Sequence, residues 1–249
     1  MTRSFLAPAV AAVAISLASC GDRSARDDRP APPDGGKQGL SGFFAPKPGE
    51  AWTYRVERRL PRHARLSAAD RKRHTSLSQE GFQLEFERKR VCAGILRPEG
   101  AKREFTCIDI FEDGKLKERE LYDVGPEGLF GRGWARTVNG KAEMTLSDPV
   151  PIAVPRMAAG KSWEARSTDD NRDFRFRVIE RTPVTVPAGT FETARIQILS
   201  ESNGRHLEHT IWFAENVGIV KEESVRSSPD AILLRETSEL VDWHLPEGS

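Results

Sequence analysis

Two histidines, His206 and His209, have the spacing in this sequence that comes nearest to a metal-binding fragment. Zinc proteases use His-Glu-x-x-His on a helix, where the two imidazoles share one face. Here the chain reads His206-Leu207-Glu208-His209, and the flanking residues alternate as they do in a β-strand. Residues three apart on a strand point to opposite faces of the sheet. We therefore expect no metal ion shared by these histidines.

Motifs for nucleophilic catalysis and phosphate binding are missing from the sequence as well. The chain has no Gly-x-Ser-x-Gly motif, which places a nucleophilic serine between a strand and a helix. Residues 128–133 read Gly-Leu-Phe-Gly-Arg-Gly, without the lysine of a phosphate-binding loop and without a following helix pattern. We expect no catalytic residues, no metal and no cofactor. A hydrolase whose active site is assembled from distant residues remains the alternative.

Cys92 and Cys107 form a candidate disulfide. If Glu99 and Gly100 make a two-residue turn, the two cysteines lie directly opposite each other across a hairpin. This register would make them a hydrogen-bonded pair, whose wide Cα separation constrains the S–S torsion. We predict the bridge, with a longer loop that shifts the register, and reduced buried thiols are the alternative.

A run of basic residues follows the first predicted strand. Glu57 and Asp70 are its only acidic members. The run could contact anionic lipid headgroups or an acidic envelope partner; alternatively it is a solvated loop. Its basic residues are Arg55, Arg58, Arg59, Arg62, Arg65, Arg71, Lys72 and Arg73.

The composition of the whole chain excludes some classes of protein. The 249 residues include 38 Lys and Arg against 37 Asp and Glu, a formal net charge of +1. A near-neutral chain gives no electrostatic argument for nucleic acid as a partner. The only long apolar stretch is at the N-terminus, which excludes a polytopic membrane protein.

From residue 43 onward, short alternating runs are separated by turn residues, which predicts β-strands. Phe82, Leu84 and Phe86 alternate with polar residues, and the run Phe174-Arg175-Phe176 does the same. Asp113-Gly114 joins residues 104–112 to residues 115–124 in a predicted hairpin, because Asp-Gly favours the positive φ values of a type I′ turn.

The Asn203-Gly204 dipeptide predicts a second hairpin with a defined register. A two-residue loop at this position places Ile196 opposite Ile211 and Ala194 opposite Phe213. These four apolar side chains then share one face of the hairpin. Burial of this apolar face fixes the register, because a shift of one residue would turn these side chains to the opposite face.

These patterns predict an all-β, mostly antiparallel fold with at most one or two short helices. The spacing of the turns fits a large curved sheet, a partial barrel or a sandwich. One short helix is expected within residues 67–79, with Ser67 as its N-cap.

The N-terminus has the features of a secretory signal peptide. Arg3 precedes an apolar run over residues 5–17, which is too short to span a bilayer as a helix. The end of this run and the three residues after it, Leu17-Ala18-Ser19-Cys20, resemble the lipobox of bacterial lipoproteins. The resemblance implies cleavage before Cys20 and acylation of its sulfur and α-amine. Several acyl chains on one residue would give stable membrane anchoring.

This resemblance divides the chain into a signal peptide at residues 1–19, a lipidated Cys20 with a disordered tether to residue 42, and one β-rich domain at residues 43–249. The tether is rich in Pro, Gly, Asp and Arg and cannot bury enough apolar surface to fold. Gly21 stands where the inner-membrane retention signal would place Asp. The resemblance therefore favours the periplasmic face of the outer membrane over the inner membrane.

Two motifs in the C-terminal half resemble the signature of a group of uncharacterised secreted or lipid-anchored bacterial β-proteins. Residues 185–194 contain Val-Pro-Ala-Gly-Thr-Phe, and residues 212–221 contain Trp-Phe-Ala-Glu-Asn-Val-Gly. The resemblance covers about residues 159–225 and brings no catalytic residues with it. Both motifs make sense as folding signals, since Gly189 and Gly218 permit tight turns.

The leading functional hypothesis is a lipid-anchored envelope protein with a non-enzymatic binding or structural role. A carrier that holds an acyl chain or another apolar ligand in the concave face of its sheet is the first alternative, by analogy of fold alone. The hydrolase named above is the second.

Overall fold

The computed structural model describes residues 44–98, 101–125, 127–138, 141–167, 172–202 and 204–246. The predicted signal peptide, Cys20 and the tether lie outside these residues. The proposed Glu99-Gly100 turn and Asn203 also lie outside them.

Antiparallel strands account for most of the described chain, as the alternating pattern predicts, and one short helix accompanies them. The strands and the helix are β1 (Ala51–Leu60), α1 (Ala68–Arg73), β2 (His74–Leu77), β3 (Phe82–Leu96), β4 (Phe105–Glu112), β5 (Lys115–Gly125), β6 (Gly128–Val138), β7 (Lys141–Ala153), β8 (Ser162–Ser167), β9 (Arg172–Val186), β10 (Gly189–Ser202), β11 (Arg205–Ala214), β12 (Gly218–Ser228) and β13 (Ala231–His244).

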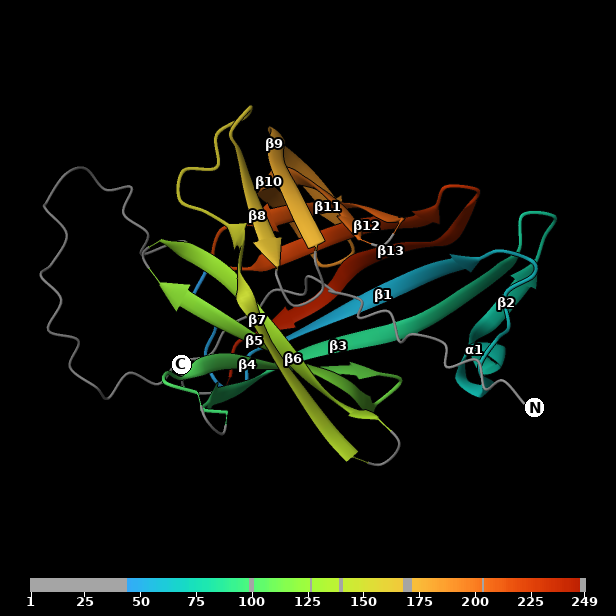
Figure 1. The fold of residues 1–249 in the computed structure, drawn as a ribbon, viewed down its shortest axis with the longest axis horizontal. Coiled ribbons are helices and arrows are strands. Elements are labelled where there is room, and N and C mark those ends of the chain that lie inside the picture. The colour runs from blue at the N-terminus through green and yellow to red at the C-terminus, as the bar shows by residue number, and fades with distance from the viewer. Residues whose placement is uncertain are drawn as a thin grey trace, which may run out of the picture.

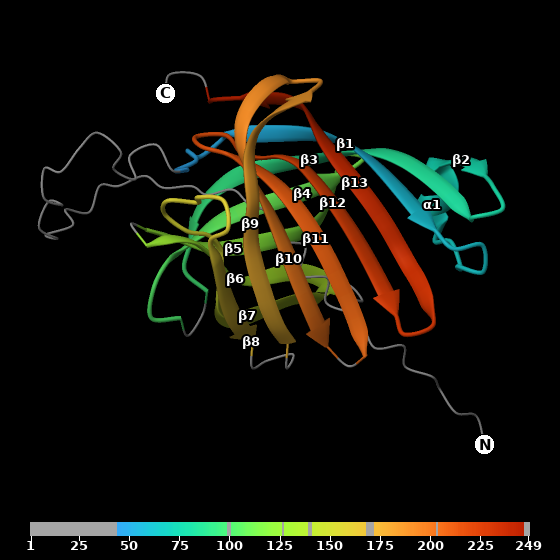
Figure 2. The same cartoon turned by 90° about the horizontal axis from the view of Figure 1, so that it is seen from above.

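All the described strands belong to one sheet, with the order β7-β6-β5-β4-β3-β1-β13-β12-β11-β10-β9-β8 and with β2 paired to β3. Consecutive strands are neighbours in two meanders, β3–β7 and β8–β13. The first strand joins them, because β1 pairs with β3 on one side and with the last strand, β13, on the other. Figure 2 shows the two meanders as facing walls, green behind and orange to red in front.

The sheet curves until its two ends meet, so that it resembles a nearly closed barrel (Figure 1). At the ends, Trp163 on β8 donates a hydrogen bond from Nε1 to the carbonyl oxygen of Pro151 on β7, at 2.7 Å. The predicted all-β class is therefore confirmed, and the single curved sheet corresponds to the partial-barrel form.

Both predicted hairpins have the expected pairing. Glu112 pairs with Lys115 across Asp113 and Gly114, whose φ values of 48° and 72° suit a type I′ turn. In the second hairpin, Ile196 lies opposite Ile211 and Ala194 opposite Phe213. All four of these side chains are buried, so the register follows from the apolar face.

The helix α1 begins where the sequence predicts and ends earlier than residue 79. The Ser67 hydroxyl accepts a hydrogen bond from the Asp70 amide at 3.1 Å, and the Asp70 carboxylate accepts one from the Ser67 amide at 3.3 Å, which completes a capping box. From His74 the chain becomes strand β2. Within the described residues, no helix has the length and apolar character needed to cross a membrane.

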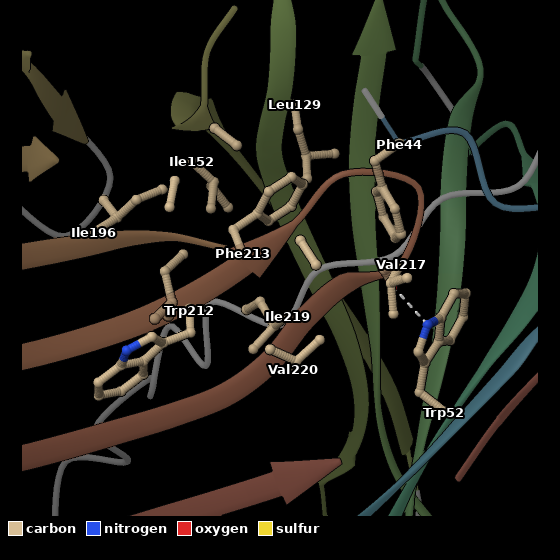
Figure 3. Close-up of a cluster of buried hydrophobic side chains, with 14 of the residues drawn as sticks. Phe44, Trp52, Leu129, Ile152, Ile196, Trp212, Phe213, Val217, Ile219 and Val220 are labelled. Atoms are coloured by element: carbon tan, nitrogen blue, oxygen red, sulfur yellow. Dashed lines mark hydrogen bonds between the residues drawn. The ribbon is translucent and has the colours of Figure 1, made fainter. Parts of the chain in front are cut away.

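The core lies inside the curve of the sheet. Along β1, Trp52, Tyr54 and Val56 point inward and are at most 1% exposed, whereas the side chains between them point outward. Trp52 donates a hydrogen bond from Nε1 to the carbonyl oxygen of Val217 at 2.8 Å (Figure 3). Tyr54 donates one to the carbonyl oxygen of Ile219 at 2.9 Å. The aromatic rings of β1 therefore tie the two meanders together.

Phe44 closes the core beside the turn between β11 and β12. Its ring centroid lies 6.0 Å from that of Trp52 and 5.8 Å from that of Phe213. The ring packs on Gly218, where φ is 94° and an added Cβ would lie 2.8 Å from a ring carbon. Figure 3 shows Phe213 pointing into this cluster and Trp212 pointing away from it. Gly218 thus serves both the turn and the packing of Phe44.

We expect Ile196→Ala to lower the free energy of unfolding by about 2–5 kcal/mol, because Ile196 is fully buried in the core and its truncation leaves a cavity. Urea denaturation followed by tryptophan fluorescence measures the change. Ile179→Ala is the matched control, because Ile179 on the neighbouring strand is 38% exposed, and its cost should stay below about 1 kcal/mol. Equal losses in the two variants would contradict the assigned interior.

Candidate functional site

Charged side chains gather inside the sheet next to the apolar core. On β3 the inward positions begin with Leu84 and Phe86 and continue with Arg88 and Arg90, since every second residue of a strand faces the same side. Arg88 is 8% exposed and Arg90 is 0% exposed. A buried guanidinium is costly unless carboxylates surround it.

Other strands bring the partners of these arginines. Glu112 is the last residue of β4, Glu222 lies on β12, Glu236 on β13 and His209 on β11. Two further arginines complete the group, one from β1 and one from the end of α1. We call this set the interior charge network, and it comprises Arg58, Arg73, Arg88, Arg90, Glu112, His209, Glu222 and Glu236.

Arg88 occupies the centre of the network. Its Nη1 lies 2.8 Å from Glu236 Oε1 and 3.7 Å from a Glu222 oxygen, and its Nη2 lies 3.0 Å from Glu112 Oε1. Arg58 shares two of these carboxylates, at 2.6 Å from Glu236 and 3.6 Å from Glu112. One guanidinium thus links strands β4, β12 and β13 across the interior.

Arg90 lies deeper and is held by one carboxylate and one ring. Its Nη2 donates a hydrogen bond to Glu222 Oε1 at 2.7 Å, and its guanidinium carbon lies 4.7 Å from the centre of the Tyr54 ring. His209 Nε2 lies 3.3 Å from the other oxygen of Glu222. Glu222 therefore bridges β3 and β11 through two basic side chains.

Arg73 covers the network from the end of α1. Its Nη1 lies 2.9 Å from Glu112 Oε2, and its Nε lies 2.7 Å from Asp113 Oδ2 at the β4–β5 turn. The guanidinium also stacks over the Phe86 ring at 4.1 Å. The capped helix thus places a basic side chain over one end of the curved sheet.

The network keeps its carboxylates ionised. Burial opposes ionisation of Glu236, but Arg88 and Arg58 outweigh burial and lower its pKa to about 2. Burial also opposes ionisation of Glu222 and Glu112, and neighbouring arginines again lower the pKa below the ordinary value, with His209 contributing at Glu222. Carboxylates held ionised in this way cannot donate protons near neutral pH, so the arrangement suits ion pairing rather than general acid catalysis.

The basic residues between Arg55 and Arg73 do not all lie on the same side of the sheet. Arg58 and Arg73 turn inward and pair with Glu236 and Glu112 of the interior charge network, so these two side chains point away from the outer surface. Arg55 pairs on the outer surface with Glu239 at 3.1 Å. The remaining members are exposed, namely Arg59, Arg62, Arg65, Arg71 and Lys72.

The predicted bridge between Cys92 and Cys107 is wrong. An irregularity in the pairing of β3 with β4 sets Cys92 opposite Ile108 and Cys107 opposite Gly94. Cys92 packs in the interior core, whereas Cys107 packs with Phe105 and Leu121 in a separate cluster. Cys107 is a buried thiol, and burial raises its pKa to about 12.

His206 and His209 point to opposite faces, as the strand interpretation predicts. His206 is exposed and lies 3.6 Å from Glu201, while His209 is buried beside Glu222. Within the part of the chain that the structure describes, no group of three or more His, Cys, Asp or Glu residues could hold a metal ion.

Sequence reasoning missed most of the network, although one signal for it was present. The alternation that identifies Leu84 and Phe86 as buried extends without a break to Arg88 and Arg90. An arginine at a predicted core position requires a buried acidic partner. The identity of that partner depends on β1 lying between β3 and β13, which no local pattern reveals.

Comparison with known proteins gives a family match over part of the chain. Residues 157–228, from just before β8 to the end of β12, match the model of a family described as DUF3108-like. This segment includes both motifs on which the sequence resemblance rests. No curated protein matches the chain in sequence.

Two crystal structures are similar to the chain at low identity. One is the structure of a protein assigned as exported, with a YmcC-like fold, from Bacteroides fragilis NCTC 9343. It is 13% identical in sequence with a TM-score of 0.39, and the alignment covers 81% of this chain and 98% of the Bacteroides chain. The other is the structure of a protein assigned as a lipoprotein from Parabacteroides distasonis ATCC 8503. It is 15% identical in sequence with a TM-score of 0.40, and the alignment covers 82% of this chain and 99% of the Parabacteroides chain.

We expect Glu236→Gln to lower the free energy of unfolding at neutral pH by about 3–5 kcal/mol, because it removes the buried carboxylate that lies nearest to both Arg58 and Arg88. The folded-state pKa of Glu236 is lowered to about 2, below an unfolded value of about 4.3. Its contribution is therefore present above about pH 5 and is lost as the pH falls towards 2.

Urea denaturation at a series of pH values measures both effects, and the variant should show a smaller loss of stability on acidification than the wild type. Glu239→Gln is the control, because Glu239 on the same strand pairs at the outer surface with Arg55. Its cost should stay below about 1 kcal/mol. Identical acid profiles for the wild type and Glu236→Gln would contradict the lowered pKa.

Proposed function

We propose that this protein is a bacterial envelope lipoprotein, anchored by acyl chains on Cys20 at the periplasmic face of the outer membrane, with a non-enzymatic β domain. The observation that carries the proposal is the position of Cys20, directly after Leu17-Ala18-Ser19 and the apolar run of the leader. The polar, proline-rich segment that follows has the composition of a flexible tether, and the first strand begins only at Ala51.

A binding or structural role agrees with the chemistry of the interior. The carboxylates of the interior charge network are committed to ion pairs, and the lowered pKa of each of Glu112, Glu222 and Glu236 removes the proton that a general acid would need. The inward positions of the described strands hold packed rings and ion pairs, so they do not favour the acyl-carrier alternative.

The exposed basic residues beside α1 suit contact with the membrane surface. Arg59, Arg62 and Arg65 follow the inward-facing part of β1, and Arg71 and Lys72 lie on the exposed side of the helix. Each basic residue near an anionic surface contributes about 1 kcal/mol of attraction. We propose anionic lipid or an acidic envelope protein as their partner.

Metabolic labelling with an alkyne analogue of palmitate tests the anchor. We expect the wild type to incorporate the label and to sediment with outer membranes, and Cys20→Ala to incorporate none, because the variant lacks the sulfur that is acylated. Cys107→Ala is the control and should be labelled as the wild type is, since Cys107 is a buried thiol of the β domain. Label on Cys20→Ala would overturn the proposed anchor, and labelled wild type in inner membranes would overturn the proposed location.

A further inference from the structure

The exposed basic residues beside α1 differ from several others on the outer surface, because they lack carboxylate partners. On the walls of the sheet, Arg55 pairs with Glu239 at 3.1 Å, and Arg195 pairs with Glu180 at the same distance. Within the described ranges, the side chains that make no ion pair or hydrogen bond include Arg59, Arg62, Arg65 and Lys72. Their charge is therefore available to a partner outside the chain.

The strand register adds a like-charge contact at the same end of the sheet. Arg59 on β1 lies directly opposite Arg235 on β13. Both side chains are exposed on the outer face, since the neighbouring residues Arg58 and Glu236 point inward. Like charges directly opposite each other on a sheet are destabilising, and an anionic surface in front of them would offset that cost. We call this end of the sheet the basic end, and its members are Arg59, Arg62, Arg65, Arg71, Lys72 and Arg235.

Carboxylates are too few at the basic end to balance it. Between residues 59 and 81 and between residues 229 and 235, the acidic residues are Asp70, Glu80 and Asp230. Asp70 completes the capping box of α1. Glu57 and Glu85 lie farther back on the outer face, opposite each other. The net positive charge of the basic end thus stands out in a chain whose formal net charge is only +1.

An exposed apolar side chain lies beside these charges. Leu77 on β2 is 50% exposed. It pairs in register with Phe82, and Phe82 pairs with Leu60, the last residue of β1. Basic residues around an exposed apolar side chain suit the surface of a bilayer, because the cations meet anionic headgroups while the apolar group enters the acyl boundary. The charges alone would suit any acidic partner, and Leu77 favours the bilayer.

We propose that the basic end docks on a bilayer that contains anionic lipid. This inference deepens the proposed function and rests on it for the bilayer concerned, which is the one that holds Cys20. The chain enters the domain at the other end of β1, where Phe44 packs against Trp52. Figure 1 shows α1 and β2 at the opposite end of that strand.

The lengths of the segments allow the anchor and the basic end to share one membrane. The 10 residues of β1 separate the two ends by about 30 Å. The tether at residues 21–42 can extend to about 75 Å. The tether is therefore long enough for the far end of the domain to reach the bilayer in which the acyl chains are inserted.

Quenching of a fluorophore by spin-labelled lipid tests the docking. The fluorophore is attached to the full lipidated chain through Ser76→Cys, next to Leu77, and the native Cys92 and Cys107 are each only 2% exposed. The vesicles contain phosphatidylcholine alone or with about 30% phosphatidylglycerol. We expect most of the emission to be lost on the anionic vesicles and retained on the neutral ones. Salt at about 1 M should restore the emission, because it screens the attraction.

Paired substitutions distinguish the basic end from charge elsewhere on the surface. Arg65→Gln combined with Lys72→Gln should weaken docking on anionic vesicles at least about tenfold, because two attractions to the surface are lost. Arg175→Gln combined with Arg177→Gln is the matched control, since both arginines are exposed on the outer face of β9. This control should dock as the wild type does.

Flotation of the same vesicles separates the docking surface from the anchor. Flotation of the wild type with both kinds of vesicle supports the anchor, and flotation with anionic vesicles alone would overturn the anchor and support the docking surface. Flotation with neither would overturn both. If the chain floats with both, equal emission on the two kinds of vesicle, full quenching in the Arg65→Gln and Lys72→Gln variant, or lost quenching in the control would overturn the docking surface alone. Equal emission is also the result expected if the partner is an acidic protein.

Discussion

The insertion of β1 between β3 and β13 is the constraint on which the rest of the structure depends. It joins two meanders that are each built from consecutive strands, and it brings β3 within reach of β12 and β13. Arg88 can therefore contact Glu236, and Arg90 can contact Glu222, although more than a hundred residues separate each pair in the chain. In the apolar core, Trp52 on β1 also connects β1 to the β11–β12 turn, through its hydrogen bond to the carbonyl oxygen of Val217.

This closure gives the interior two parts with different physical chemistry. In one part, stacked rings and aliphatic side chains exclude water and contribute the usual free energy of apolar burial. In the other part, arginines and glutamates are desolvated together, and each is tolerated only because the others are present. The carboxylates respond with lowered pKa values, because the arginines around them favour the ionised form.

Local sequence patterns were sufficient for the strands and for the pairings of the hairpins. The register of Ile196 with Ile211 follows from a dipeptide turn and one apolar face, both of which are local. The pairing of Cys92 with Cys107 failed because one irregularity in β3 moves the two side chains to different clusters, and neither cysteine encodes that shift. Arg88 could be placed inside the sheet by alternation alone, but its partners are set by the long-range pairing of β1 with β13.

The coupling energy between Arg58 and Glu236 is the most direct measure of whether the buried charges act as a unit. Their closest atoms are 2.6 Å apart, and both side chains are largely buried. A double-mutant cycle of Arg58→Met and Glu236→Gln, measured by urea denaturation at neutral pH, gives this energy. Our account predicts a coupling of at least about 1 kcal/mol. Losses that add to within about 0.5 kcal/mol would contradict the account, because they would mean that the two residues contribute independently.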